Sequence, residues 1–314
     1  MRVLVTGGAG FIGSSLVHAL IAGGDTVAVV DDLSTGTVAN LHPAASFRSL
    51  DVLDPALAQV MADFAPEAVV HLAAQTDVQR SIADPERDRA VNVDGTVAVA
   101  RAAAAAGARV MLSASSAAVY GDPETLPILE TAPKRPINPY GASKLAAESA
   151  LARALAGTGV DFACMRFANV YGPRQDWRGE GGVVAILGAR FAAGERPVIF
   201  GDGTQTRDFI YVGDVVAFIL DALDAETPLA SGSPDGPAYN VSTGTATSVE
   251  QVAGYLCALS DVLVGIDHEP ARQGDIRHSV LDPAKAAAAL DWRAAQPIES
   301  GLAITWRWLS TTLR

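Results

Sequence analysis

Short runs of apolar residues alternate with longer helical patterns through the first half of the chain. The helical patterns begin near Phe11, Pro55, Pro85 and Pro139 and carry apolar or Ala-rich faces. Strands that alternate with helices predict a parallel, doubly wound α/β sheet, and almost wholly apolar strands indicate that helices cover both of its faces. The expected strands are residues 2–6, 26–30, 47–50, 68–73, 109–114 and 161–167.

The alternation breaks after residue 168, where a second and smaller part of the chain is expected. We therefore divide the chain into a first domain, residues 1–168, and an interleaved C-terminal α/β lobe, residues 169–314. Parts of 209–243 are expected to pack back onto the first sheet, including a helix with Asp214 as its N-cap. The other helices expected in the lobe are residues 183–193, 248–260, 282–290 and 298–313.

Composition and charge limit the class of protein. The 314 residues are 49% hydrophobic, which is enough for a large core. A net charge of −12 argues against binding to the phosphate backbone of nucleic acids or to an anionic membrane surface. Cys164 and Cys257 lie far apart in apolar segments, which favours two reduced cysteines, and no metal-ligand spacing is present. Reduced cysteines indicate a cytoplasmic location. No apolar run reaches the roughly 18 residues of a membrane span.

A glycine-rich turn follows the first expected strand. Gly7 permits a tight turn, Gly10 lets the backbone approach a pyrophosphate, and Gly13 lets the next helix pack closely on the strand. The N-terminus of that helix would face the anion. The second strand ends at Asp31, at the spacing of a carboxylate that accepts from a ribose hydroxyl, and it would repel a 2′-phosphate. NAD is therefore predicted rather than NADP, the alternative being that Asp31 only stabilises its turn.

A second candidate site is the pair Tyr140 and Lys144. Asn138 is suited to N-cap a helix and Pro139 to its first position, so the pair is expected on one helical face. The ammonium would lower the pKa of the phenol, roughly 10 when free, towards a value at which Tyr140 can act as a base. The pair alone is weak evidence, because such pairs are common on exposed helices. Ser116 would project at the same edge of the sheet, unless it merely terminates its strand.

Motifs along nearly the whole chain resemble those of one family. They occupy residues 6–13, 31–36, 71–75, 92, 115–121, 140–144, 169–174, 201–208 and 272–275. In combination they resemble the extended short-chain dehydrogenases/reductases, and within these the UDP-glucose (UDP-galactose) 4-epimerases. The resemblance implies a Rossmann domain over residues 1–168 that holds NAD, a lobe over residues 169–314 that binds a nucleotide sugar, and a homodimer.

The same resemblance assigns roles to single residues. Ser116, Tyr140 and Lys144 would be catalytic, and no metal is implied. The cofactor would contact Gly7, Gly10, Phe11, Ile12, Gly13, Asp31, Asp32, Leu33, Ser34, Thr35, Gly36, Asp51, Val52, Leu72, Ala73, Ala74, Gln75, Asn92, Tyr140 and Lys144. The nucleotide sugar would contact Ser116, Asn169, Val183, Val198, Phe200, Arg207, Arg272, Asp275 and Ser279.

Two arginines are expected to bind the diphosphate of a UDP-sugar. Guanidinium groups bind phosphate oxygens through two parallel hydrogen bonds, which suits Arg207 and Arg272 in an otherwise acidic protein. Either arginine alone would more often pair with a surface carboxylate. Asp275 resembles a ribose-binding carboxylate, with a solvated turn residue as an equal alternative.

The residues after Ser116 distinguish reactions within the family. By resemblance, Tyr140 as phenolate takes the proton of the sugar 4-hydroxyl while hydride passes from C4 to NAD⁺, and Ser116 hydrogen-bonds the same oxygen. Dehydratases of the family carry an Asp-Glu pair at positions that are Ala117 and Ala118 here. A methyl group cannot transfer a proton, so simple epimerisation is favoured over elimination.

Other functions stay open on the sequence alone. Within the family these are a dehydratase and an epimerase for UDP-glucuronate or dTDP-sugars. Outside the epimerases they are a reductase that releases its cofactor and a non-catalytic NAD-binding regulator. Ser279 stands where some relatives carry a Tyr that excludes N-acetyl sugars, so UDP-GlcNAc and UDP-GalNAc are candidate substrates as well.

Overall fold

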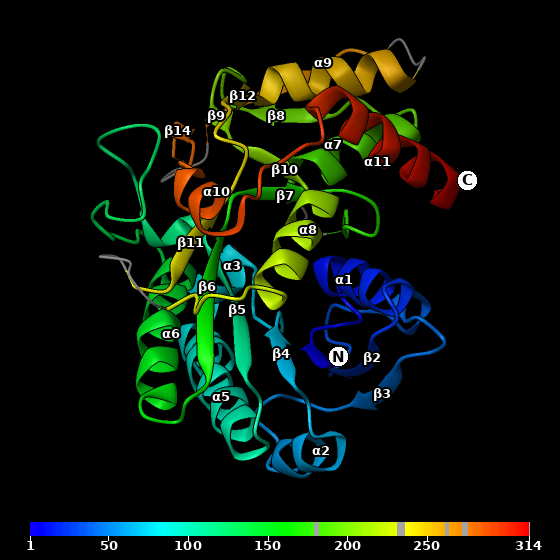
Figure 1. Ribbon diagram of the computed structural model, residues 1–314. Coiled ribbons are helices and arrows are strands. Elements are labelled where there is room, and N and C mark those ends of the chain that lie inside the picture. The colour runs from blue at the N-terminus through cyan, green and yellow to red at the C-terminus, as the bar shows by residue number, and fades with distance from the viewer. Residues whose placement is uncertain (179–181, 231–235, 261–263, 272–275, 314) are drawn as a thin grey trace.

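The computed structural model describes residues 1–178, 182–230, 236–260, 264–271 and 276–313. It contains a large sheet covered by helices and a smaller group of helices and short strands beyond one end of that sheet (Figure 1). The sheet and the smaller group are built on separate apolar cores.

The large sheet has seven strands in the order β11-β6-β5-β4-β1-β2-β3, and every neighbouring pair is parallel. This confirms the doubly wound α/β fold. The chain order reverses between β1 and β4, and ligands of such sheets bind beyond the carboxyl ends of the strands at this point. The strands are β1 Arg2–Thr6, β2 Thr26–Asp31, β3 Ser46–Ser49, β4 Ala68–His71, β5 Val110–Ser116, β6 Asp161–Phe167 and β11 Ala238–Val241.

Helices cover both faces of the sheet, as the apolar strands predicted. On one face, α1 (Phe11–Ala22) packs beside α8 (Val212–Leu223). On the other face lie α2 (Leu57–Phe64), α5 (Gly95–Ala105) and α6 (Pro139–Leu155). The shorter helices are α3 Val78–Ala83, α4 Pro85–Arg89 and α10 Ala284–Leu290, with 3₁₀ turns at Val38–Asn40 and Ala117–Val119.

The smaller group packs three helices around its own core (Figure 1). These are α7 (Val183–Ala192), α9 (Val249–Ser260) and α11 (Ile298–Thr312), which contact one another pairwise. Short sheets join this group to the large one. They are β7 Asn169–Tyr171 with β10 Phe209–Tyr211, β8 Val198–Phe200 with β13 Asp267–Glu269, and β9 Thr206–Arg207 between β12 Thr247–Ser248 and β14 His278–Ser279.

Segments after residue 168 return to the first sheet. β11 is its edge strand beside β6, and α8 covers its face together with α1. The chain therefore crosses between the two bodies several times, which agrees with the expected interleaving.

Two expectations about helices differ from the structure. Asp214 is not an N-cap: α8 already begins at Val212, and the carboxylate of Asp214 instead accepts from the backbone nitrogens of Ala295 and Gln296 at 3.1 Å. The expected helix from Pro85 to Ala106 is interrupted by a π-helical turn at Ala90–Asp94. Neither difference has a local sequence signal, because both follow from contacts with distant segments.

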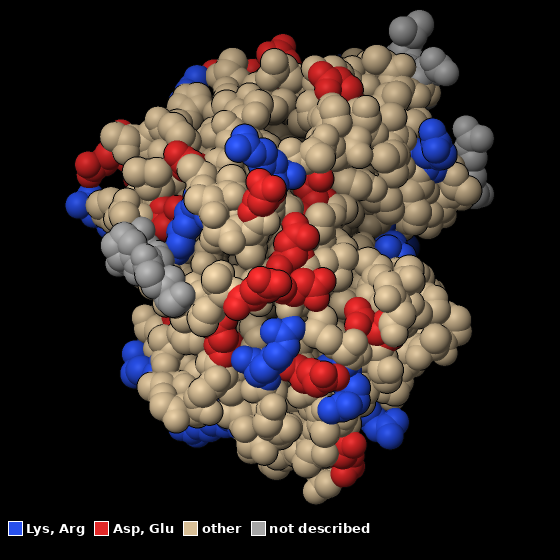
Figure 2. All heavy atoms as spheres, viewed as in Figure 1, with Lys and Arg blue, Asp and Glu red and all other residues tan. Residues whose placement is uncertain are grey.

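Acidic and basic side chains are mixed on the face viewed in Figure 2, where Asp and Glu form a band across the middle. No helix among the described residues is long and apolar enough to cross a membrane. Cys164 is buried and Cys257 partly buried, and both are free thiols, as expected.

Candidate active site

The glycine-rich turn joins β1 to α1 and leaves no room for side chains. Gly7 has a φ of +71°, and a Cβ there would lie 2.6 Å from the Ala73 nitrogen. A Cβ on Gly13 would lie 2.1 Å from the Gly7 carbonyl oxygen. Gly10 is the N-cap of α1 and provides no side-chain cap, so the first N–H groups of the helix face outwards. This cradle fits the pyrophosphate of a dinucleotide.

Filling this cradle is expected to weaken cofactor binding. Gly13→Ala should lower NAD affinity by about tenfold or more, the equivalent of 1.4 kcal/mol, because the turn must open to admit the methyl group. The matched control is Gly254→Ala in α9, where a Cβ meets no described atom within 4 Å. That control should keep NAD affinity and stabilise the fold by about 0.5–1 kcal/mol. Unchanged NAD affinity in Gly13→Ala, measured by calorimetry, would contradict the assignment.

Asp31 ends β2 beside this turn. Its carboxylate accepts from the Ala9 nitrogen at 2.9 Å and from the Leu33 nitrogen at 2.8 Å. Burial raises the pKa of Asp31, and these two hydrogen bonds oppose the rise. Leu33 has a φ of +60°, so the loop turns sharply back over the glycine turn, where Gly36 contacts Ala9 closely. The loop residues Asp32, Ser34 and Thr35 are exposed.

Asp51 and Val52 follow β3 on the same side of the sheet. Val52 is buried, whereas Asp51 forms an ion pair with Arg87 at 3.0 Å. Burial would raise the pKa of Asp51, but the hydrogen bonds from Leu53 and Arg87 outweigh it and the pKa is lowered. Asp51 is therefore a carboxylate near neutral pH.

The residues after β4 connect the glycine turn to α6. Leu72 and Ala73 contact the Gly7 position, and the chain then runs to Gln75, whose nitrogen donates to Asn92 Oδ1 at 2.9 Å. Asn92 Nδ2 donates in turn to Ser143 Oγ at 3.0 Å. The structure thus brings the expected cofactor residues Gln75 and Asn92 next to the Tyr140 helix.

Helix α6 begins as its sequence predicts. Asn138 N-caps it by accepting from the Gly141 nitrogen at 2.8 Å, and Pro139 occupies the first helical position. Tyr140 and Lys144 follow one turn apart on this helix. Lys144 is only 5% exposed, and its Nζ donates to the Ala114 carbonyl of β5 at 3.0 Å. Helix α6 is therefore attached directly to the strand that carries Ser116.

Burial controls the ionisation of this pair. It lowers the pKa of Lys144 to about 8, although Asp88 and Glu148 oppose the change. It raises the pKa of the Tyr140 phenol, with a hydrogen bond to Ser116 acting in the opposite direction. The expected lowering of the phenol pKa is therefore not reached by the groups of the protein alone, because burial penalises the phenolate.

Ser116 lies at the end of β5, and its side chain acts to lower the pKa of the Tyr140 phenol. Its Oγ accepts from the Ala118 nitrogen at 3.1 Å and so caps the 3₁₀ turn that follows. Ser116 does terminate a strand, but it also faces the phenol. Ala117 and Ala118 form the next turn and offer no acid or base there.

A buried ion pair lies behind the catalytic helix. Arg166 of β6 and Glu148 of α6 bond through Nε–Oε1 at 2.9 Å and through a second pair of atoms at 2.7 Å. Arg166 also donates to the Tyr120 hydroxyl at 2.9 Å, and Ser115 donates to Glu148 at 2.5 Å. This network fixes α6 against β5 and β6.

The expected substrate residues are more scattered. Arg207 lies directly opposite Ser279, because β9 and β14 pair in that register. Val198 and Phe200 share one face of β8, Val183 is the first residue of α7, and the exposed Asn169 begins β7. Arg272 and Asp275 lie outside the described residues.

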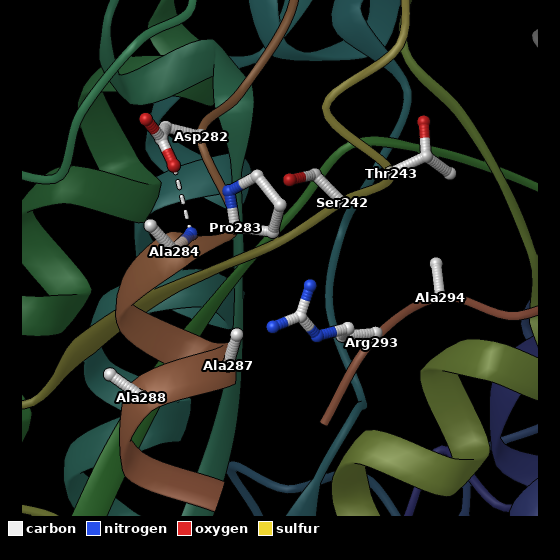
Figure 3. Close-up of a pocket in the computed structure, with 9 residues that line it drawn as sticks. All are labelled: Ser242, Thr243, Asp282, Pro283, Ala284, Ala287, Ala288, Arg293 and Ala294. Atoms are coloured by element: carbon white, nitrogen blue, oxygen red, sulfur yellow. Dashed lines mark hydrogen bonds between the residues drawn. The ribbon is translucent and has the colours of Figure 1, made fainter. Parts of the chain in front are cut away.

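A separate cavity of about 560 Å³ lies where β11 ends against α10. Figure 3 shows the Arg293 guanidinium directed into it, towards Ser242, with Asp282 turned to the Ala284 nitrogen instead. Its described lining residues come from the two positions after β11, from α10 and from the segments directly before and after α10, and they include none of Ser116, Tyr140 and Lys144.

Two residues near Tyr140 were not singled out from the sequence. Asp88 is buried four residues before Asn92, and Ser143 bridges Asn92 to the Tyr140 carbonyl, to which it donates at 3.0 Å. The four-residue spacing of Asp88 and Asn92 on an expected helix was the available signal.

Comparisons with known proteins identify the family of this chain. The model of the NAD dependent epimerase/dehydratase family matches residues 3–242. The chain is 42% identical over 311 residues to a UDP-glucose 4-epimerase of Mycolicibacterium smegmatis, covering 97% of each chain. A UDP-glucose 4-epimerase of Thermotoga maritima, solved with UDP-glucose, has 38% identity and a TM-score of 0.94, with 100% of each chain covered.

A further solved structure carries a different sugar chemistry. The UDP-N-acetylglucosamine 4-epimerase of Methanobrevibacter ruminantium, in complex with UDP-N-acetylmuramic acid, is 30% identical. The TM-score is 0.92, and the match covers 99% of this chain and 98% of that one. Family model, sequence and structure therefore agree: the chain belongs to the NAD dependent epimerase/dehydratase family.

Proposed function

We propose that this protein is an NAD-dependent 4-epimerase of UDP-hexoses, with UDP-glucose and UDP-galactose as substrates. The observation that carries the proposal is the meeting of Ser116 and Tyr140 at the end of β5, beside the buried Lys144. The glycine cradle for a dinucleotide is linked to this centre through Gln75, Asn92 and Ser143. The related 4-epimerases that bind UDP-sugars support the same reaction.

Different residues of the chain have different roles in the epimerisation. A bound NAD would be held by the glycine turn and by the residues after β4, and it would supply a reversible hydride acceptor. The Tyr140 phenolate oxygen takes the proton of the sugar 4-hydroxyl and later returns it to the same oxygen. The Ser116 hydroxyl donates to the resulting 4-keto oxygen and holds it in place. Ala117 and Ala118 cannot act as acid or base, so the keto sugar does not lose water. It rotates within the site instead and presents its other face for the return of hydride.

Product analysis tests the proposal. Purified protein incubated with UDP-glucose, without added nicotinamide nucleotide, is expected to form UDP-galactose that chromatography separates. Accumulation of a 4-keto-6-deoxy sugar would instead identify a dehydratase. Change in external NAD with time would identify a reductase, and no product from any nucleotide sugar in a panel would favour a regulator.

Substrate range is proposed to extend to UDP-GlcNAc and UDP-GalNAc. Ser279 lies opposite Arg207, a proposed diphosphate ligand, and its small side chain leaves space for an N-acetyl group. We expect Ser279→Tyr to lower kcat/KM for UDP-GlcNAc by about tenfold or more, with UDP-glucose changed much less, since a bulky ring would fill that space. Ser310→Tyr in the exposed end of α11 is the control. Equal losses on both sugars would contradict this role.

The assembly is proposed to be a homodimer through α5 and α6. The proposal stands on the family resemblance alone. Light scattering on the purified protein would decide it, and a mass near the 32.4 kDa of one chain would refute it.

A further inference from the structure

The catalytic helix packs against a buried carboxylate that the reaction as described leaves unused. Asp88, in α4, is 1% exposed. Its Oδ1 accepts from Gln75 Nε2 at 2.8 Å and from Asn92 Nδ2 at 3.2 Å. Its Oδ2 is buried and has no hydrogen-bond partner among the described residues. Burying a carboxylate away from water costs folding free energy unless hydrogen bonds or a nearby positive charge offset the cost.

We propose that Asp88 is a positioning residue of the catalytic centre: its carboxylate holds Gln75 and Asn92 and, through Ser143, the first turn of α6, and it places a negative charge behind that turn. The effect on catalysis rests on the proposed epimerase function, whereas the hydrogen bonds of Asp88 do not depend on that function.

The positioning part follows from a continuous chain of hydrogen bonds. Asp88 Oδ1 accepts from Asn92, Asn92 donates to Ser143 Oγ, and Ser143 donates to the Tyr140 carbonyl. The π-helical turn Ala90–Asp94 contacts α6, and Asn92 lies within it. Inserted turns of this kind are frequent at functional sites because they redirect a side chain. Asp88 thus connects Gln75, in the loop that follows β4, with the first turn of the catalytic helix.

The electrostatic part follows from the groups that face Lys144. Glu148 is on the same helix, but its charge is already paired with Arg166. Cys164 of β6 stays a neutral thiol because burial raises its pKa. His71 of β4 is also neutral, since burial lowers its pKa to about 3. Asp88 is therefore the facing carboxylate, among the described residues, that has no ion-pair partner of its own.

The charge of the Asp88 carboxylate also affects the pKa of the Tyr140 phenol. Asp88 raises the pKa of Lys144, against burial, and it raises the pKa of Tyr140 in addition to burial. In an epimerisation the proton returns to the oxygen it left, so Lys144 is needed as a fixed positive charge and not as a relay to solvent. A neutral Lys144 would stabilise no phenolate, and Asp88 extends the pH range in which Lys144 is charged.

The test is the pH dependence of Asp88→Asn. Asn keeps a carbonyl oxygen for Gln75 and Asn92 but removes the charge. Both limbs of the kcat profile should move to lower pH by about one pH unit, because removing the charge lowers the pKa of both Lys144 and Tyr140. Asp94→Asn is the control, because Asp94 is exposed and pairs with the exposed Arg89. A purely structural role would lower kcat at every pH without moving either limb, which would overturn the proposal.

A second readout does not depend on turnover. The chain has three lysines, Lys134, Lys144 and Lys285, so NMR of protein labelled at lysine ¹³Cε can follow each amine, with Lys144→Met identifying the signal. The Lys144 titration midpoint should fall by about one pH unit in Asp88→Asn and also in Asp88→Ser, a smaller variant in case the first does not fold. An unmoved midpoint refutes the proposal. A wild type that epimerises no sugar while the midpoint still moves would instead refute the proposed function.

Discussion

Replacing Tyr140 with Phe is expected to lower the kcat of epimerisation by about 10²–10⁴-fold while NAD stays bound. The phenol is partly buried next to Ser116, and no other acid or base among the described residues is bonded to that serine side chain. Phe keeps the ring and its packing but removes the oxygen that accepts the proton. Steady-state kinetics and the content of bound NAD would be measured together.

A tyrosine elsewhere provides the control for this variant. Tyr255 of α9 donates to Glu299 in the smaller group of helices, so Tyr255→Phe should leave kcat within about twofold. If Tyr140→Phe kept more than a tenth of wild-type kcat, another group would have to take the proton. If it lost NAD, the residue would serve binding instead of chemistry.

Removing Glu148 is expected to cost the protein about 3–5 kcal/mol of unfolding free energy. Glu148→Ala leaves the Arg166 guanidinium buried without its carboxylate, and it also breaks the hydrogen bond from Ser115. The pair joins α6 to β6, so the loss should also loosen the helix that carries Tyr140 and Lys144. Urea unfolding followed by circular dichroism would measure the effect.

An exposed ion pair provides the comparison. Glu124 is 75% exposed and pairs with Arg135, so Glu124→Ala should change stability by less than about 1 kcal/mol. The double variant Glu148→Leu with Arg166→Met should recover much of the loss, because it leaves no unpaired buried charge. A loss below about 1 kcal/mol in Glu148→Ala would mean that water reaches this pair.

Local features of this protein could be predicted because they depend on neighbouring residues. The clash that a side chain would cause at Gly7 or Gly13 is a property of a tight strand-turn-helix connection. The start of α6 follows from Asn138 and Pro139, whose side chain and ring satisfy the helix terminus directly. The alternation of strands and helices predicted a parallel, doubly wound sheet, since short crossovers allow few arrangements.

Long-range contacts decided what the sequence left open. The carboxylate of Asp214 accepts from residues 295 and 296, and Asn92 reaches Ser143 of α6 from a π-helical turn. The pairing of Arg207 with Ser279 depends on the register of two short strands that are distant in sequence. Burial, too, decided the ionisation of Tyr140 and Lys144, whose spacing alone suggested an activated phenol.

The sequence by itself therefore determined the fold class, the dinucleotide turn and the position of the catalytic pair on one helix. Only the tertiary structure decided which charges surround that pair and how far they are removed from water. The physical reason is that steric and capping effects act over a few residues, whereas desolvation and charge pairing depend on every segment that packs against a site.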